Sequence, residues 1–103
     1  MKLTSLGLSE DIVQQLQQTI KRYPVDDAVI YGSRGRGDYK PTSDIDLAIY
    51  GQNLSHTEFA NLYGELESLP ILFHMDIAHV EALHNPALIA HIQRDGQSII
   101  DLD

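Results

Sequence analysis

The sequence contains no cysteine, and this absence excludes two kinds of stabilising chemistry. Without thiols the chain can form neither a disulfide framework nor a thiolate metal site. A chain without disulfides is compatible with the cytoplasm, and we expect a cytoplasmic location.

Long apolar runs are also missing from the chain. No stretch of about 18 apolar residues occurs, so the sequence predicts no membrane-spanning helix and no membrane partner. The first ten residues, "MKLTSLGLSE", hold one lysine and no apolar core of signal-peptide length, so we expect no secretory leader.

Basic residues are scarce. Seven lysines and arginines are set against fifteen acidic residues, which gives a net charge of −8. Proteins that bind long nucleic acids usually present a basic face to the phosphate backbone. Apart from Arg34, Arg36 and Lys40 the basic residues are scattered, so we expect no long nucleic-acid partner, although a single nucleotide is not excluded.

The chain shows no internal repeat, low-complexity tract or flexible linker. Its 103 residues, of which 43% are apolar and 21% charged, suit one small globular domain spanning residues 1–103. Apolar spacing and capping residues predict helices over residues 9–23, from Ser55 to the residue before Pro70, and from Pro86 to Gly96. Short apolar or alternating runs predict strands over residues 27–31, 44–50, 71–78 and 97–101, with a glycine-rich loop between the first two.

Two of the predicted strands carry acids opposite an apolar stripe. In residues 44–50 the apolar side chains alternate with Asp44 and Asp46, and in residues 71–78 Asp76 lies opposite another apolar stripe. These patterns predict an α+β fold, a two-layer sandwich with a mixed sheet. Helices should cover its apolar face, and the acids should lie on the other, open face.

The acids Asp44 and Asp46 are candidate metal ligands. Strand geometry places them on one face about 7 Å apart, and like charges at that distance raise each other's pKa unless a cation intervenes. Mg²⁺ takes oxygen ligands, often one or two protein carboxylates completed by water and phosphates. Alternatives are a solvated strand face or pairing with Arg34 or Arg36. Asp76 strengthens the metal interpretation if it emerges on the same side of the sheet.

The Gly32–Ser33 pair ends a predicted strand and opens a turn. Glycine lets a backbone approach a phosphate closely, and the serine hydroxyl and nearby N–H groups can donate to it. An ordinary tight turn is the alternative. Arg34 and Arg36 could hold phosphates through forked N–H donors, or could instead hold Asp38, and the sequence does not choose between them.

Other side chains have two interpretations as well. His74 shares a predicted strand face with Asp76, so a zinc site is an alternative to magnesium. Tyr31 and Tyr50 end the first two predicted strands. They could form an exposed aromatic surface for a partner, or they could cap the core.

The stretch "GSRGRGDYKPTSDIDLAI" resembles the signature of the minimal nucleotidyltransferases, a branch of the polymerase-β-like superfamily. That signature is a glycine–serine pair, about ten residues, D-x-D, and a third acid on a later strand. Gly32–Ser33, Asp44, Asp46 and Asp76 fill every position. The order of the predicted elements is similar as well, so the resemblance covers most of the chain.

The resemblance implies transfer of a nucleoside monophosphate from an NTP, such as AMP from ATP, to an acceptor with two Mg²⁺ ions. Gly32 and Ser33 would hold the triphosphate. Asp44 and Asp46 would carry the metals, and Asp76 would contact the catalytic metal and help to accept the proton.

The resemblance also implies a partner. Minimal members are antitoxins paired with helical HEPN toxins, and some adenylylate a tyrosine of the toxin. The domain is too small to add an acceptor-binding module, which favours a protein acceptor over a small molecule such as an antibiotic. The alternative from another class is a binding module that neutralises its partner by occlusion.

Overall fold

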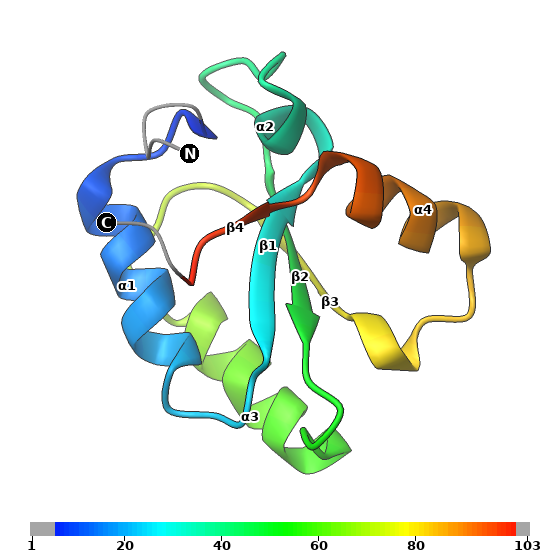
Figure 1. Cartoon of the computed structure of the whole chain (residues 1–103). Helices are drawn as coiled ribbons and strands as arrows, with labels where there is room; N and C mark the ends of the chain where they lie inside the picture. The colour runs from blue at the N-terminus through cyan, green and yellow to red at the C-terminus, as the bar shows by residue number, and fades with distance from the viewer. Residues whose placement is uncertain (1–5, 101–103) are drawn as a thin grey trace.

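A computed structural model describes residues 6–100 of the chain (Figure 1). Its helices are α1 (Glu10–Ile20), α2 (Gly32–Arg36), α3 (His56–Glu67), the short 3₁₀ helix η2 (Val80–Ala82) and α4 (Pro86–Asp95). Its strands are β1 (Asp27–Tyr31), β2 (Ile45–Tyr50), β3 (Met75–His79) and β4 (Gln97–Ser98). Within this range no helix is long and apolar enough to cross a bilayer.

Within residues 6–100 the strands form one four-stranded mixed sheet in the order β3-β2-β1-β4. Strand β1 pairs antiparallel with both β2 and β4, whereas β2 and β3 run parallel. The parallel pair requires a crossover connection, which α3 provides on one side of the sheet. This arrangement confirms the predicted α+β fold with a mixed sheet.

One face of the sheet carries the main core. The β2 side chains Ile45, Leu47 and Ile49 are completely buried there, as their alternation predicts. The helices α1 and α3 lie side by side over this face (Figure 1). They contribute the buried side chains Val13, Leu16, Ile20, Leu62 and Leu66.

Side-chain caps fix where these helices begin. Ser9 accepts a hydrogen bond from the Ile12 N–H at the start of α1. Ser55 and Glu58 form a reciprocal capping box at the start of α3. Asn85 caps α4, in which Pro86 occupies the first helical turn. All three helix starts agree with the sequence-based prediction.

The other face of the sheet is only partly open. Helix α4 lies on this side (Figure 1) and buries Ile92 against Val29 of β1 and Ala48 of β2. An entirely open polar face was expected from the sequence. The apolar residues at one end of the face provide a binding surface for α4, and only the acidic end remains uncovered.

Two predicted elements differ in the structure. The glycine-rich segment forms the single-turn helix α2, because Gly32 and Gly37 adopt positive φ angles of 66° and 94° at its two ends. Residues 71–74 do not extend β3, because β2 begins only at Ile45 and offers these residues no strand partner. One contact remains, in which the Ile45 N–H donates to the His74 carbonyl at 2.9 Å.

Smaller differences concern element ends. Helix α1 ends at Ile20 rather than at residue 23. His79 is the last residue of β3 instead of following it, and β4 has two residues. The predicted end of that last strand, residue 101, lies outside the described residues.

Candidate active site

Three polar side chains form a row across neighbouring strands at one end of the sheet. Tyr31 of β1 is paired in register with Asp46 of β2, and Asp46 is paired in register with Asp76 of β3. Paired residues on adjacent strands lie about 5 Å apart and point to the same face. We call Tyr31, Asp46 and Asp76 the acidic row. The row brings together two of the three predicted acids.

The third predicted acid, Asp44, immediately precedes β2 and is exposed. Strand geometry puts it about 7 Å along the chain from Asp46. Its charge raises the pKa of Asp46, so the two carboxylates are close enough to interact.

The acidic row is electrostatically strained. Partial burial raises the pKa of Asp46 above its ordinary value, and the neighbouring carboxylates of Asp76 and Asp44 raise this pKa further. Burial also raises the pKa of Tyr31, with the charges of Asp46 and Asp76 adding to the shift. A cation bound between these groups would relieve the repulsion.

The glycine–serine pair lies directly against the acidic row. A Cβ atom added to Gly32 would come within 2.3 Å of the Asp46 Oδ2 atom. Gly32 also has a positive φ of 66°, which side-chain-bearing residues rarely adopt. The glycine of the predicted motif and Asp46, the second acid of its D-x-D pair, thus lie in direct contact.

Arg34 lies inside the protein with 1% of its surface exposed. Its guanidinium group donates to the backbone carbonyl oxygens of Leu6, Gly7 and Ser43 at 2.8–3.2 Å. The group also stacks over the Phe73 ring, 4.6 Å from its centroid. Arg34 therefore ties the segment before α1 to the loop before β2, and its donors are committed within the protein.

Arg36 differs from Arg34 in each of these respects. Its side chain is 44% exposed and forms ion pairs with Asp38 at 3.2 Å and with the buried Asp95 at 3.5 Å. Its positive charge also acts on Asp46, where it offsets part of the rise in pKa. Of the two arginines that the sequence left open, Arg36 is the one available at the surface beside the acidic row.

The acidic row suits a magnesium ion only in part. Within residues 6–100 no group of three or more histidine, aspartate or glutamate side chains is close enough to hold a metal. Mg²⁺ often uses only one or two protein carboxylates and completes its shell with water and substrate phosphates. Asp46 and Asp76 supply such a pair, so this donor set fits an ion that binds together with a phosphate-bearing ligand.

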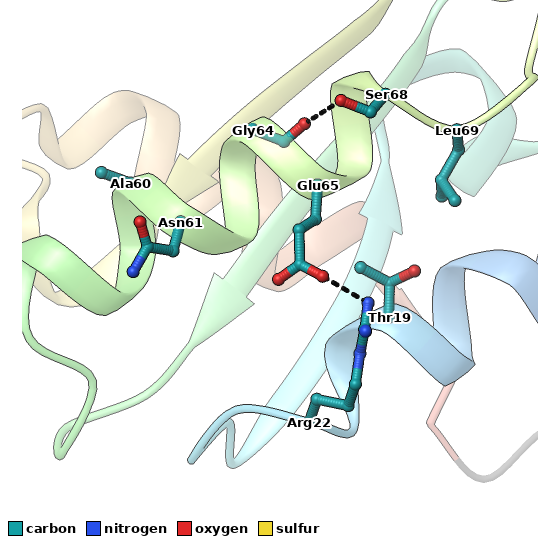
Figure 2. A pocket seen from close by; sticks show the side chains of 8 residues that line it. All are labelled: Thr19, Arg22, Ala60, Asn61, Gly64, Glu65, Ser68 and Leu69. Carbon is teal, nitrogen blue, oxygen red and sulfur yellow. Dashed lines mark hydrogen bonds and ion pairs between the residues drawn. The ribbon is translucent and has the colours of Figure 1, made fainter.

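A hollow of about 530 Å³ between α1 and α3 offers a different candidate site (Figure 2). An ion pair between Arg22 and Glu65 lies within it. Its walls belong to the helices that cover the main core, on the face of the sheet opposite the acids, and none of the predicted site residues lines it. The hollow therefore has no part in the acidic row.

Sequence reasoning missed two parts of the arrangement. Tyr31 was considered only as a surface or core-capping residue, whereas it is also the first member of the acidic row. Its partial burial, like that of Tyr50, against the Val29 and Ala48 cluster agrees with core capping. The buried Asp95 lies far from Arg36 in sequence, and no local pattern indicated that they would pair.

The fold is similar to that of solved structures. A chain of a crystal structure of a toxin–antitoxin with AMP-PNP aligns with a TM-score of 0.66 and 20% identity, over 89% of this chain and 73% of that one. A presumed nucleotidyltransferase from Sulfolobus solfataricus aligns with a TM-score of 0.49 and 19% identity, over 93% of this chain and 79% of that one. A search of curated protein sequences gave no match.

The family comparison covers the whole candidate site. Residues 14–103 match the family described as Polymerase beta, Nucleotidyltransferase. This range includes the glycine–serine pair, the D-x-D acids and the third acid on β3. With the fold and the acidic row, the match identifies this chain as a member of the Polymerase beta nucleotidyltransferase family.

Proposed function

We propose that the chain transfers a nucleoside monophosphate, AMP from ATP, to a hydroxyl group of a partner protein in a Mg²⁺-dependent reaction. One observation carries the proposal. Gly32 lies so close to the Asp46 carboxylate that no side chain fits between them, and Asp76 is in register beside Asp46. A triphosphate held at Gly32–Ser33 would thus meet two carboxylates.

Each residue has a distinct part in the proposed reaction. The backbone around Gly32 and the Ser33 hydroxyl would hold the triphosphate. Asp46 and Asp76 would hold a metal ion that accompanies it, with the exposed Asp44 as a further ligand on the substrate side. When bound, Mg²⁺ neutralises charge on the phosphates and makes the acceptor hydroxyl more acidic. The acceptor oxygen bonds to the α-phosphorus as the bond to pyrophosphate breaks, and the Asp76 carboxylate takes the hydroxyl proton.

Arg36 is the arginine that we assign to the phosphates. Arg36→Gln should weaken ATP binding about tenfold, since one charge-assisted contact is lost. It should cost about 1 kcal/mol or less of stability, because the buried Asp95 keeps its shorter pair with Arg94. Arg34→Gln should instead cost about 3 kcal/mol of unfolding free energy, because buried carbonyl oxygens lose their donors. Calorimetry with ATP and urea unfolding of both variants would separate the two roles.

The partner that we propose is a HEPN-type helical toxin, with this chain as its antitoxin. The fold similarity to a chain of a toxin–antitoxin crystal structure with AMP-PNP supports the proposal, as does the sequence resemblance to minimal nucleotidyltransferases. A net charge of −8 suits a partner with a basic surface.

The test is transfer of label from ATP labelled at its α-phosphate to a purified HEPN-type helical toxin. Wild type with Mg²⁺ should label the partner, and mass spectrometry should find added AMP. Asp44→Ala and Asp76→Asn should abolish the label while both variants remain folded by circular dichroism. An unmodified partner that is nevertheless bound and inhibited would favour the occlusion module over the enzyme.

A further inference from the structure

A second surface hollow lies between the start of α1 and the chain segments that lead into β2 and β3. It encloses about 560 Å³ and is predominantly apolar. Its apolar lining consists of Ile12, Pro41, Pro70, Ile71, Leu72 and Phe73. We call this hollow the Leu72 groove.

Leu72 is fully exposed, and within residues 6–100 it is the one large apolar side chain that is exposed. Its neighbours Ile71 and Phe73 are partly buried and pack against the main core, as does Ile12. Phe73 is further held beneath the Arg34 guanidinium. The groove thus combines a fixed apolar floor with an apolar side chain that contacts only solvent, as protein-binding sites commonly do.

Two chain segments connect the Leu72 groove to the candidate active site. His74, which also lines the groove, is two residues from Asp76, and Thr42 is two residues from Asp44. The two segments are joined by the hydrogen bond from the Ile45 N–H to the His74 carbonyl. In extended chain, two to four residues span about 7–13 Å, so a peptide in the groove could present its next residues to the acids.

Acidic side chains outnumber basic ones in and next to the segments that line the groove. Asp11 lines one wall, with Glu10 beside it in the first turn of α1, and the acids Asp44 and Asp76 follow at the site end. Lys40 is the basic residue next to Pro41. The excess of negative charge favours an occupant with basic residues and disfavours a second copy of this chain, which carries −8 itself.

We propose that the Leu72 groove binds the segment of the partner protein that carries the acceptor hydroxyl, an inference that rests on the proposed transfer function. The segment is extended, with an apolar side chain in the groove and lysine or arginine residues around it. The acceptor hydroxyl lies about three or four residues from the apolar anchor, which is the span from Leu72 to the acids. The groove would therefore set acceptor specificity, separately from nucleotide binding.

The test uses two fluorescein-labelled peptides of twelve residues each. The first has a central leucine, four lysines, and a tyrosine four residues from the leucine, and the second replaces the leucine with serine. Wild type should bind the leucine peptide about tenfold more tightly than the serine peptide, since burying a leucine side chain contributes at least that much affinity. Leu72→Ser should lose this preference, and Leu72→Lys should weaken both peptides by repulsion.

Asn61→Lys is the matched control, since it adds the same charge at an exposed site on α3, in the hollow of Figure 2. It should retain the leucine preference of wild type. Equal binding of the two peptides by wild type, or a preference that survives in Leu72→Ser, would overturn the docking inference. So would a dimer in sedimentation that Leu72→Lys dissociates, because the occupant would then be a second copy.

ATP titration of the same proteins separates this inference from the proposed function. Leu72 lies outside the nucleotide site, so its variants should bind ATP with Mg²⁺ as wild type does. Wild type that binds ATP with Mg²⁺ but shows no leucine preference would refute the groove alone. Wild type that shows the preference but binds no ATP would refute the transferase and leave the groove as a peptide site.

Discussion

The two ends of one sheet face share the same pairing between β1 and β2 but have opposite surroundings. At one end the acidic row of Tyr31, Asp46 and Asp76 is uncovered. One step along the same strands, Val29 and Ala48 are paired in register and lie buried beneath Ile92 of α4. The pairing of β1 with β2 is the same at both ends, whereas β4 extends the sheet beside Val29 and not beside Tyr31. The two ends therefore differ in their side chains and in the presence of β4.

The comparison shows how a small domain divides one surface between stability and chemistry. The alanine side chain of Ala48 lets α4 approach the sheet closely, and the contact removes apolar surface from water. At the other end two carboxylates occupy paired positions where like charges are destabilising. We infer that the covered end stabilises the fold while the acidic end is kept for ligands.

The largest expected effect is at the covered end. Ile92→Ala should lower the free energy of unfolding by about 2–4 kcal/mol, because it leaves a cavity beneath α4. Urea unfolding measures this change. The exposed neighbour on the same helix, His91→Ala, should change stability by less than about 0.5 kcal/mol. A loss below about 1 kcal/mol for Ile92→Ala would mean that α4 contributes little to stability.

The next prediction compares the two glycines at the ends of α2. Gly32 and Gly37 both have positive φ angles, so alanine at either position should cost about 1–2 kcal/mol of stability. Only at Gly32 would the new Cβ atom meet the Asp46 carboxylate, since nothing lies within 4 Å of a Cβ at Gly37. Gly32→Ala should therefore weaken ATP binding at least about tenfold.

Calorimetric titration of ATP in the presence of Mg²⁺ checks this difference. Gly37→Ala should retain the wild-type affinity for ATP, because its strain is confined to the backbone. Equal loss of affinity in the two variants would show that the shape of α2, and not the contact with Asp46, matters for binding.

The smallest expected effect concerns charge in the acidic row. The pKa of Asp46 is raised in the folded protein, so wild type loses stability as pH rises through that pKa. Asp46→Asn should remove the loss and stabilise the protein at pH 7 by about 0.5 kcal/mol, a rise of about 2–4 °C in melting temperature. Below the ordinary aspartate pKa the advantage should vanish, because the carboxyl group is then protonated in both states.

Asp95→Asn should have the opposite effect on stability to Asp46→Asn. Arg94 and Arg36 lower the pKa of Asp95, so its ionised form stabilises the fold at pH 7 and loses this effect as pH falls through the lowered pKa. Melting curves from pH 3 to pH 8 should show a lower melting temperature for Asp95→Asn than for wild type at neutral pH.

A melting temperature for Asp46→Asn below that of wild type at pH 7 would make Asp46 a structural residue.

The sequence predicted the parts of the site that depend on local alternation. Asp46 lies opposite Ile45 and Leu47 as expected, because neighbouring residues of a strand must point to opposite faces. The pairing of Asp46 with Asp76 is different. Alternation fixes faces within a strand, whereas strand order and register are set by the whole sheet.

Other features were inaccessible for the same physical reason. The apolar stripe of α4 required burial but did not specify which face of the sheet would provide it. Arg34 looked equivalent to Arg36 in sequence, yet its role depends on the carbonyl oxygens of Leu6 and Gly7, which are distant along the chain. Residues 71–74 alternate like a strand, but no neighbouring strand extends far enough to pair with them.

The central claim is that the acidic row and Gly32 form one metal-dependent nucleotide site. The most direct test is calorimetric titration of wild type and Asp76→Asn with ATP, with and without Mg²⁺. We predict that Mg²⁺ strengthens ATP binding to wild type at least about tenfold, because phosphates and carboxylates together complete the metal shell. We also predict that Asp76→Asn loses most of this gain while melting no lower than wild type. Equal affinity of wild type for ATP with and without Mg²⁺ would contradict the account.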